Sequence, residues 1–143
     1  MKLMEKVAKY HELVSHAYAD MLEAKKSGVQ RDLDRARDEY RDLMEAVRIE
    51  GECFFAMFRM YSEMKEAGNT LLNVLDDYNP ENIMKLFKAC EIARFTYSSS
   101  WSDALKTAYV FEQSGYRIDG MTEINRGSRN NKKKTPALVF EMK

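Results

Sequence analysis

The sequence has few cysteines, no long apolar run and no net charge. Its two cysteines, Cys53 and Cys90, cannot build the disulfide framework of a small secreted domain, and their spacing matches no metal motif. Both lie in apolar, helix-forming contexts, so we expect buried thiols in a reducing compartment. No segment approaches the roughly 18 apolar residues of a membrane span, and the first six residues lack a signal-peptide core. We therefore expect a cytoplasmic protein without a membrane partner.

Catalytic and cofactor-binding motifs are missing as well. The chain has no glycine-rich phosphate loop, no Glu-x-x-His or His-Glu-x-x-His motif, and no recognisable pairing of a nucleophile with a base. Glu12, His16 and Asp20 have the spacing of one helix face, but this face is expected to be solvated, and a metal would need further ligands. We expect no enzymatic activity, no metal and no cofactor.

Charge is unevenly spread although the formal net charge is zero. Residues 1–80 carry 12 Lys or Arg against 16 Asp or Glu, whereas residues 116–143 carry 7 against 3. An acidic partner is therefore expected at the C-terminal end, in a basic segment that contains no acid. This segment either neutralises phosphates or is a solvated loop. Its basic residues are Arg126, Arg129, Lys132, Lys133 and Lys134.

Helical periodicity dominates the first half of the chain. Apolar residues at alternating steps of three and four predict one helix over residues 2–27 and one unbroken helix from Gln30 to Lys65. Folding the pair about Gly28 and Val29 aligns the two apolar seams, which predicts a long antiparallel helical hairpin.

Glu50 interrupts the second apolar seam, and Gly51 follows it directly. Glu50 is either reached by water, Lys6 or Lys9 at the open end of the hairpin, or left as a contact for a partner. Glycine in mid-helix costs about 1 kcal/mol relative to alanine, so a bend or a close helix approach is expected at Gly51.

The hairpin leaves the aromatic stretch 55–65 without a partner from residues 1–28. A helix that is apolar almost all round is normally buried all round. Its cover is expected from three shorter helices over residues 71–75, 80–95 and 101–115, the second opened by the strong start signal Asn79-Pro80-Glu81.

The expected fold is mainly α and forms one compact domain overall. It consists of the helical hairpin (1–68), the three shorter helices packed on its aromatic end (69–115), and a C-terminal segment (116–143). That last segment is either a small β-hairpin with a basic tip or a flexible basic tail.

Residues 80–143 carry one further pattern. A helix and a serine-rich turn are followed by a second helix, the run Phe111-Glu112-Gln113-Ser114-Gly115-Tyr116-Arg117-Ile118 and a basic-tipped hairpin. This order resembles the winged helix-turn-helix domains of bacterial regulators. The resemblance implies that the second helix enters the major groove and that the wing touches the DNA backbone. Carried over by position, the DNA-facing residues would be Ser99, Ser102, Lys106 and Thr107, and the wing residues Arg129 and Lys132 to Lys134.

Two functions are therefore expected to compete. The first is a non-enzymatic interaction protein, a small accessory or inhibitor protein of the kind that phages and mobile elements encode, which docks on a protein or other macromolecule. The second is a winged-helix-like DNA-binding regulator that dimerises through the helical hairpin. The expected contact patch, whose rings could instead be core, consists of Tyr97, Trp101, Lys106, Tyr109, Tyr116 and Arg117, beside the basic segment 126–134.

Overall fold

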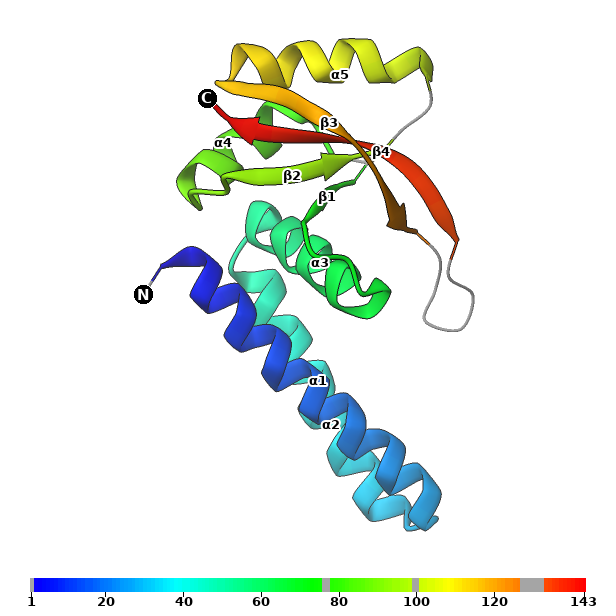
Figure 1. Ribbon diagram of the computed structural model, residues 1–143. Helices are drawn as coiled ribbons and strands as arrows, with labels where there is room; N and C mark the ends of the chain where they lie inside the picture. The colour runs from blue at the N-terminus through cyan, green and yellow to red at the C-terminus, as the bar shows by residue number, and fades with distance from the viewer. Residues whose placement is uncertain (1, 76–77, 99–100, 127–132) are drawn as a thin grey trace. The chain divides into compact units, whose positions relative to one another are not determined.

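A computed structural model describes residues 2–75, 78–98, 101–126 and 133–143, apart from the side chains of residues 101–103. The chain divides into two compact units, residues 1–58 and 59–143, with the boundary inside a helix. None of the described helices combines the length and apolarity that a bilayer crossing needs. The elements, shown in Figure 1, are α1 (Leu3–Ser27), α2 (Gln30–Ile49), α3 (Glu52–Ala67), β1 (Asn73–Val74), α4 (Pro80–Ala89), β2 (Arg94–Tyr97), α5 (Trp101–Gln113), β3 (Tyr116–Asn125) and β4 (Lys134–Met142).

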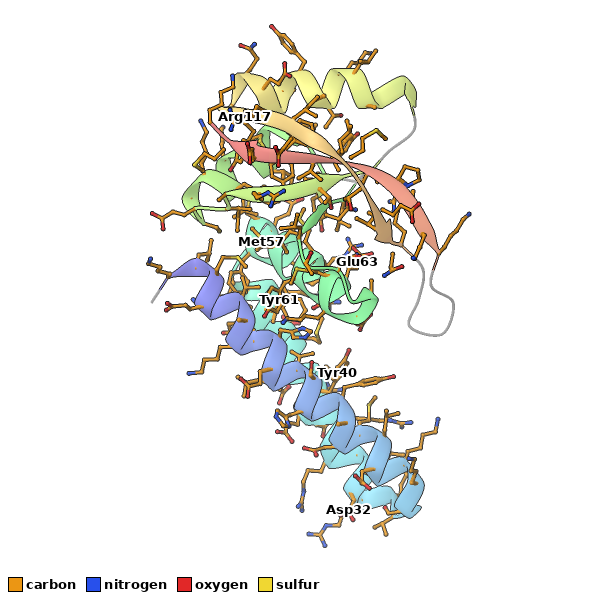
Figure 2. The ribbon with its side chains drawn as sticks, in the orientation of Figure 1. Asp32, Tyr40, Met57, Tyr61, Glu63 and Arg117 are labelled. Atoms are coloured by element: carbon orange, nitrogen blue, oxygen red, sulfur yellow. The ribbon has the colours of Figure 1, made fainter. Side chains whose placement is uncertain are left out.

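The first unit contains the antiparallel helical hairpin, so this prediction is confirmed. Helices α1 and α2 lie side by side in Figure 1, joined by a tight connection at Gly28, which caps α1 in the left-handed conformation. The Tyr18 ring packs 5.8 Å from that of Tyr40, which Figure 2 labels on α2. Three buried residues of α1 and two of α2 form the seam: Val7, Val14, Ala17, Ala36 and Val47.

The predicted unbroken helix from Gln30 to Lys65 is wrong. Helix α2 ends at Ile49 and α3 begins at Glu52, because Gly51 has a φ of +115°, which no helical residue adopts. The carboxylate of Glu50 accepts a hydrogen bond from Lys6 Nζ at 2.7 Å and lies 3.4 Å from the Tyr10 hydroxyl. Glu50 is thus paired with Lys6 of α1, as in the first of the two alternatives that the sequence left open.

The second unit is built around a four-stranded sheet in the order β1-β2-β4-β3. Strand β1 pairs with β2 in parallel, and the other two pairings are antiparallel. Helix α5 runs across one face of this sheet (Figure 1). The core under it is aromatic: the buried Phe95 ring lies about 5 Å from four other buried rings, those of Phe87 (4.9 Å), Tyr116 (5.0 Å), Phe111 (5.1 Å) and Phe140 (5.3 Å).

One of the three short helices was predicted wrongly, and a second was predicted too long. Residues 71–75 contain strand β1 instead of a helix, and the helix expected over 80–95 ends at Ala89 and is followed by β2. Glu91, with a φ of +56°, turns the chain out of α4. In this strand successive side chains point to opposite faces of the sheet. Phe95 and Tyr97 therefore share one face, and both contact Phe111 in the core. The fold is helix-rich, as predicted, but it includes a small sheet.

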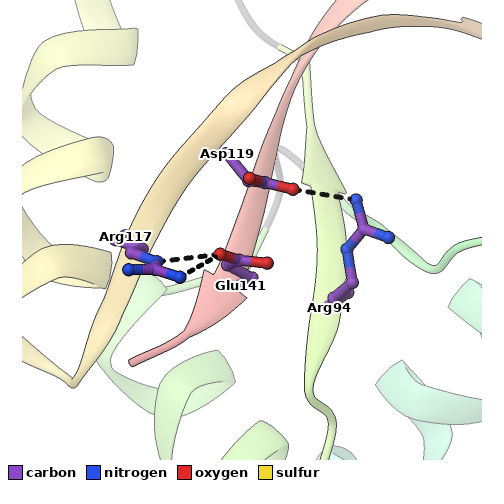
Figure 3. A network of polar contacts seen from close by, with 4 residues as sticks. All are labelled: Arg94, Arg117, Asp119 and Glu141. Carbon is purple, nitrogen blue, oxygen red and sulfur yellow. Dashed lines mark hydrogen bonds and ion pairs between the residues drawn. The ribbon is translucent and has the colours of Figure 1, made fainter.

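The C-terminal β-hairpin is confirmed, and the described parts of 116–143 are not a tail. Strands β3 and β4 pair along nearly their whole length, with a bulge at Asp119. Asp119 Oδ2 accepts a hydrogen bond from Arg94 Nη2 of β2 at 3.1 Å, and Arg117 pairs with Glu141 of β4 at 2.6 Å (Figure 3). These contacts link β2, β3 and β4 at the bulge and oppose a slip in register.

Beyond the end of β2 the hairpin continues as a two-stranded arm. Tyr97, the last residue of β2, pairs with Leu138, so residues 134–137 of β4 pair with β3 alone. We call this two-stranded part together with the adjoining pair of Met121 and Leu138, that is residues 121–126 and 133–138, the hairpin arm. Isolated two-stranded hairpins are marginal in water, but this arm is anchored: Asn69 Nδ2 donates to the Asn125 carbonyl, and the Asn125 amide donates to Asn69 Oδ1, both at 3.0 Å.

Candidate binding site

A pocket of about 280 Å³ opens where the hairpin arm leaves the sheet. It lies between the first turn of α5, the end of β2 and the arm itself. Its lining is mostly apolar and consists of Tyr97, Ser98, Ala104, Met121, Thr135, Pro136, Ala137 and Leu138.

Strand alternation explains why one face of the arm is open. Met121 pairs directly with Leu138 and shares its face, whereas Ile124 and Ala137 are buried. Met121 is 66% exposed, so its side chain is accessible to a partner. Pro136 is tolerated in β4 because β2 has already ended there, so its missing N–H breaks no bond to β2.

Basic groups border the pocket on the side of the hairpin tip. Arg126 Nη1 donates to the carbonyl oxygen of Ser98, a lining residue, at 3.2 Å. The Arg126 amide donates to the Lys133 carbonyl at 2.8 Å and closes the described end of the hairpin. Lys133 and Lys134 are exposed, and Glu123 is the one acid of the described arm. The described arm therefore carries a net positive charge, and Arg126 brings part of it to the pocket.

Two predicted contact residues prove to be core residues. Tyr97 is 5% exposed and Tyr116 is fully buried, with its hydroxyl donating to the Ile92 carbonyl at 2.7 Å. Tyr116 cannot present its ring to a partner, and Tyr97 keeps only a small part of its surface open at the pocket, so their assignment to an exposed contact patch is corrected. The physical reason is that both rings belong to the cluster around Phe95 and Phe111, which the sheet assembles from segments distant in sequence.

Of the other predicted site residues that the structure describes, all but Thr107 are accessible. Tyr109 is 63% exposed on α5, near the exposed Lys106, and Arg117 is exposed although it pairs with Glu141. Thr107, by contrast, is buried and cannot face DNA. The predicted positions that lie outside the described residues are Ser99, Arg129, Lys132 and the side chains of Trp101 and Ser102.

The connection between α4 and α5 differs from the one that the winged-helix resemblance implies. A helix-turn-helix motif joins its helices by a turn of about three or four residues. Here strand β2 lies between the two helices and pairs with β4. The order of the later elements does agree with the resemblance: Lys106 lies on the second helix, α5, and the hairpin arm comes after this helix.

The cysteines show no sign of a reactive site. Cys53 is exposed, so the prediction that it is buried is wrong, and Cys90 is half-buried at the end of α4. Burial raises the pKa of the Cys90 thiol, which lowers its thiolate fraction near neutral pH. Within the described residues no cluster of three His, Cys, Asp or Glu side chains has a geometry suited to a metal ion.

The pocket residues Ala104, Met121, Pro136 and Leu138 were missed by sequence reasoning. The partial alternation of residues 116–124 is a signal for a strand, but the bulge at Asp119 shifts the alternation by one residue. The face that Met121 occupies therefore cannot be read from the pattern.

Comparison with known proteins gives one informative result. The family model described as "Domain of unknown function (DUF7698)" matches residues 56–142, more than half of the chain. The matched range nearly coincides with the second compact unit, residues 59–143, and includes the pocket and the arm. No curated protein and no solved structure matches the chain.

Proposed function

The chain belongs to the family described as "Domain of unknown function (DUF7698)", and because that description gives no activity, we propose from the surface of the molecule that it is a non-enzymatic interaction protein. It docks on a macromolecular partner, most simply a protein, through the hairpin arm. One observation carries this proposal: an anchored arm presents an apolar pocket, and the arm's Arg126 reaches a residue that lines it.

Preorganisation is the first physical support. The arm is held by hydrogen bonds to Asn69 and by Asn125 Nδ2, which donates to the Ala67 carbonyl at 3.0 Å. A partner that binds it does not have to order it, and this reduces the entropic cost of association. An exposed methionine at such a place also adapts to different apolar surfaces.

Charge is the second support. The described arm carries Arg126, Lys133 and Lys134 against the single acid Glu123, in a chain without net charge. A basic patch of this kind steers an acidic partner towards the site and raises the rate of encounter. An accessory or inhibitor role, as encoded by phages and mobile elements, is compatible with such a surface.

The experiment is a pull-down from native lysate followed by mass spectrometry, with two matched variants. Lys133→Gln/Lys134→Gln removes two adjacent charges from the arm, and Lys25→Gln/Lys26→Gln removes two adjacent exposed charges from the end of α1. We expect the first variant to lose a partner that the second retains. Equal recovery of every protein by both variants would reject the arm as the docking surface.

The alternative function is winged-helix-like DNA binding with dimerisation through the helical hairpin. It is favoured by the exposed Lys106 on α5 and by the basic arm that follows this helix. A gel shift on random duplex DNA at two salt concentrations tests it, because phosphate contacts make affinity fall steeply with salt. DNA binding requires a shift at low salt that weakens when Lys132, Lys133 and Lys134 become Gln, and no shift at low salt rejects it.

A further inference from the structure

We infer that the pocket beside the arm is a receptor for one large apolar side chain carried by an extended acidic segment of a partner protein. The inference rests on the proposed function and adds the chemistry of the partner. It joins three features of the described residues: the size of the pocket, the course of β4 past the end of β2, and the charge at its border.

The size of the pocket sets the scale of what enters it. Pockets for drug-sized ligands and cofactors span roughly 300–1,000 Å³, and this pocket measures about 280 Å³. Ala104, Met121, Pro136 and Leu138 offer aliphatic surface with few polar groups. A single leucine, phenylalanine or methionine of a partner matches this surface, and such side chains often supply the main anchor of an interface.

The course of β4 gives the direction of the segment. Residues 134–137 pair with β3 on one side, and β2 reaches only as far as Leu138 on the other. Thr135, Pro136 and Ala137 of this stretch all line the pocket. An extended segment laid along β4 would continue the line of β2 but would receive no hydrogen bond from Pro136, which has no N–H. The pocket and the charges, more than a strand ladder, would therefore hold the segment.

Charge complementarity selects an acidic segment. Arg126 lies at the border through its hydrogen bond to the Ser98 carbonyl, and Lys134 precedes the lining residue Thr135. Carboxylates that flank the anchor residue would lie near these groups, and charge-assisted hydrogen bonds to arginine are the stronger kind.

Single-stranded nucleic acid fits the same border less well. Binding of unpaired bases uses aromatic rings whose faces are open for stacking. Tyr97 is the aromatic residue in the lining, and its ring is buried and packed edge-on against Phe111 at 5.4 Å. The described lining therefore offers no stacking face for a base.

The test uses the full chain and two fluorescent nine-residue peptides in which Asp and Glu flank a central Phe or a central Ala. We expect the Phe peptide to bind at least about tenfold more tightly by anisotropy, with methyl shifts at Ala104 and Met121 in NMR spectra. Equal affinity for both peptides would show charge attraction alone and overturn the assignment of the pocket. Tighter binding of an oligothymidine of equal charge, or of dodecanoate, would overturn the assignment to a protein segment.

A matched pair of variants locates the site. Met121→Glu places an acid at the pocket and is expected to weaken binding of the Phe peptide about tenfold or more. Met142→Glu makes the same change at an exposed methionine of β4 outside the pocket lining and should leave the affinity within about twofold. Equal effects of the two variants would place the peptide elsewhere.

Failure of this inference and failure of the proposed function are distinguishable. If no peptide binds but Lys133→Gln/Lys134→Gln still loses a partner in the pull-down, the arm docks by another chemistry and the inference falls alone. If Lys133→Gln/Lys134→Gln recovers the same proteins as the unaltered chain in the pull-down, and Met121→Glu does not change peptide binding, both the inference and the proposed function are rejected.

Discussion

The side chain of Asn69 forms two hydrogen bonds with the main chain of Asn125, one donated and one accepted, each 3.0 Å long. These two residues are 56 positions apart, and the bonds fasten the end of β3 to the segment after α3. The arm that borders the pocket therefore keeps its place through a contact that lies outside the sheet.

Asn69→Ala is expected to destabilise the chain by about 1–3 kcal/mol, because it leaves a partly buried N–H and carbonyl of Asn125 without their partner. Asn125→Ala removes only the bond to the Ala67 carbonyl and should cost about 0.5–1.5 kcal/mol. Urea unfolding measures both, and hydrogen exchange should quicken at the Asn125 amide in Asn69→Ala. A larger loss for Asn125→Ala would contradict this account of the anchor.

Gly51→Ala is expected to cost about 1–3 kcal/mol, since its φ of +115° lies outside the conformations that alanine adopts readily. Gly28→Ala is the matched control: its φ of +75° is in the left-handed helical region, where the penalty is about 1–2 kcal/mol. At neither position does a Cβ meet an atom within 4 Å, so the difference is conformational. If urea unfolding ranks Gly28→Ala as the more damaging change, the helix break does not depend on Gly51.

The Arg94–Asp119 pair should couple by about 0.2–1 kcal/mol in a double-mutant cycle, and the coupling should shrink at high salt. Both side chains are about half exposed, which limits the energy. Arg41 and Asp38, an i,i+3 pair on α2 that is more exposed, are the control, with an expected coupling near 0.3 kcal/mol. No measurable coupling between Arg94 and Asp119 would show that the pair does not stabilise the bulge.

Alkaline pH should weaken the fold through Cys90 and Tyr116. Burial raises the pKa of both groups, and the neighbouring Cys90 charge raises that of Tyr116 further. The unfolded chain therefore loses these protons first, so the free energy of unfolding is unaffected below the ordinary pKa values and falls as pH rises through the raised ones. The free energy of unfolding can be measured by urea titration at several pH values. In Cys90→Ala its decrease with pH should be less steep in the part that begins near pH 8.5. If the decrease is as steep as in the unaltered chain, the thiol has no role.

The reactivity of the thiols gives an independent check on the same shift. In the Cys53→Ser variant, iodoacetamide should label Cys90 more slowly in the folded chain than in urea, with the difference narrowing as pH rises. In Cys90→Ser the exposed Cys53 should react at similar rates in both states.

The hairpin of α1 and α2 was predictable because its information is local. Apolar steps of three and four mark the buried faces of both helices, and a short link forces them to be antiparallel. The break at Glu50 and Gly51 could be seen in the sequence only as a charged residue in the apolar seam followed by a glycine. Periodicity alone does not show whether a glycine bends a helix or ends it.

The sheet could not be predicted to the same degree because its strands find their partners far along the chain. Strand β1 has two residues and β2 has four, too few for alternation to stand out beside a helix. In the sequence, Phe95 looks like the end of a helix and Tyr97 like part of the turn after it. Their pairing with Phe140 and Leu138 shows that both belong to a strand. The pocket depends on this pairing and on the bulge, so its lining had no signature of its own.

Strand β3 lies at the edge of the sheet with residues 117–123 exposed, the arrangement from which edge-to-edge aggregation usually starts. The extra residue at Asp119 puts Arg117 and Glu123 on opposite faces, although six positions separate them. A regular strand added to this edge can match the alternation of only one half of β3. The bulge therefore also protects the chain in concentrated solution, where the edge of a straight strand would recruit further copies.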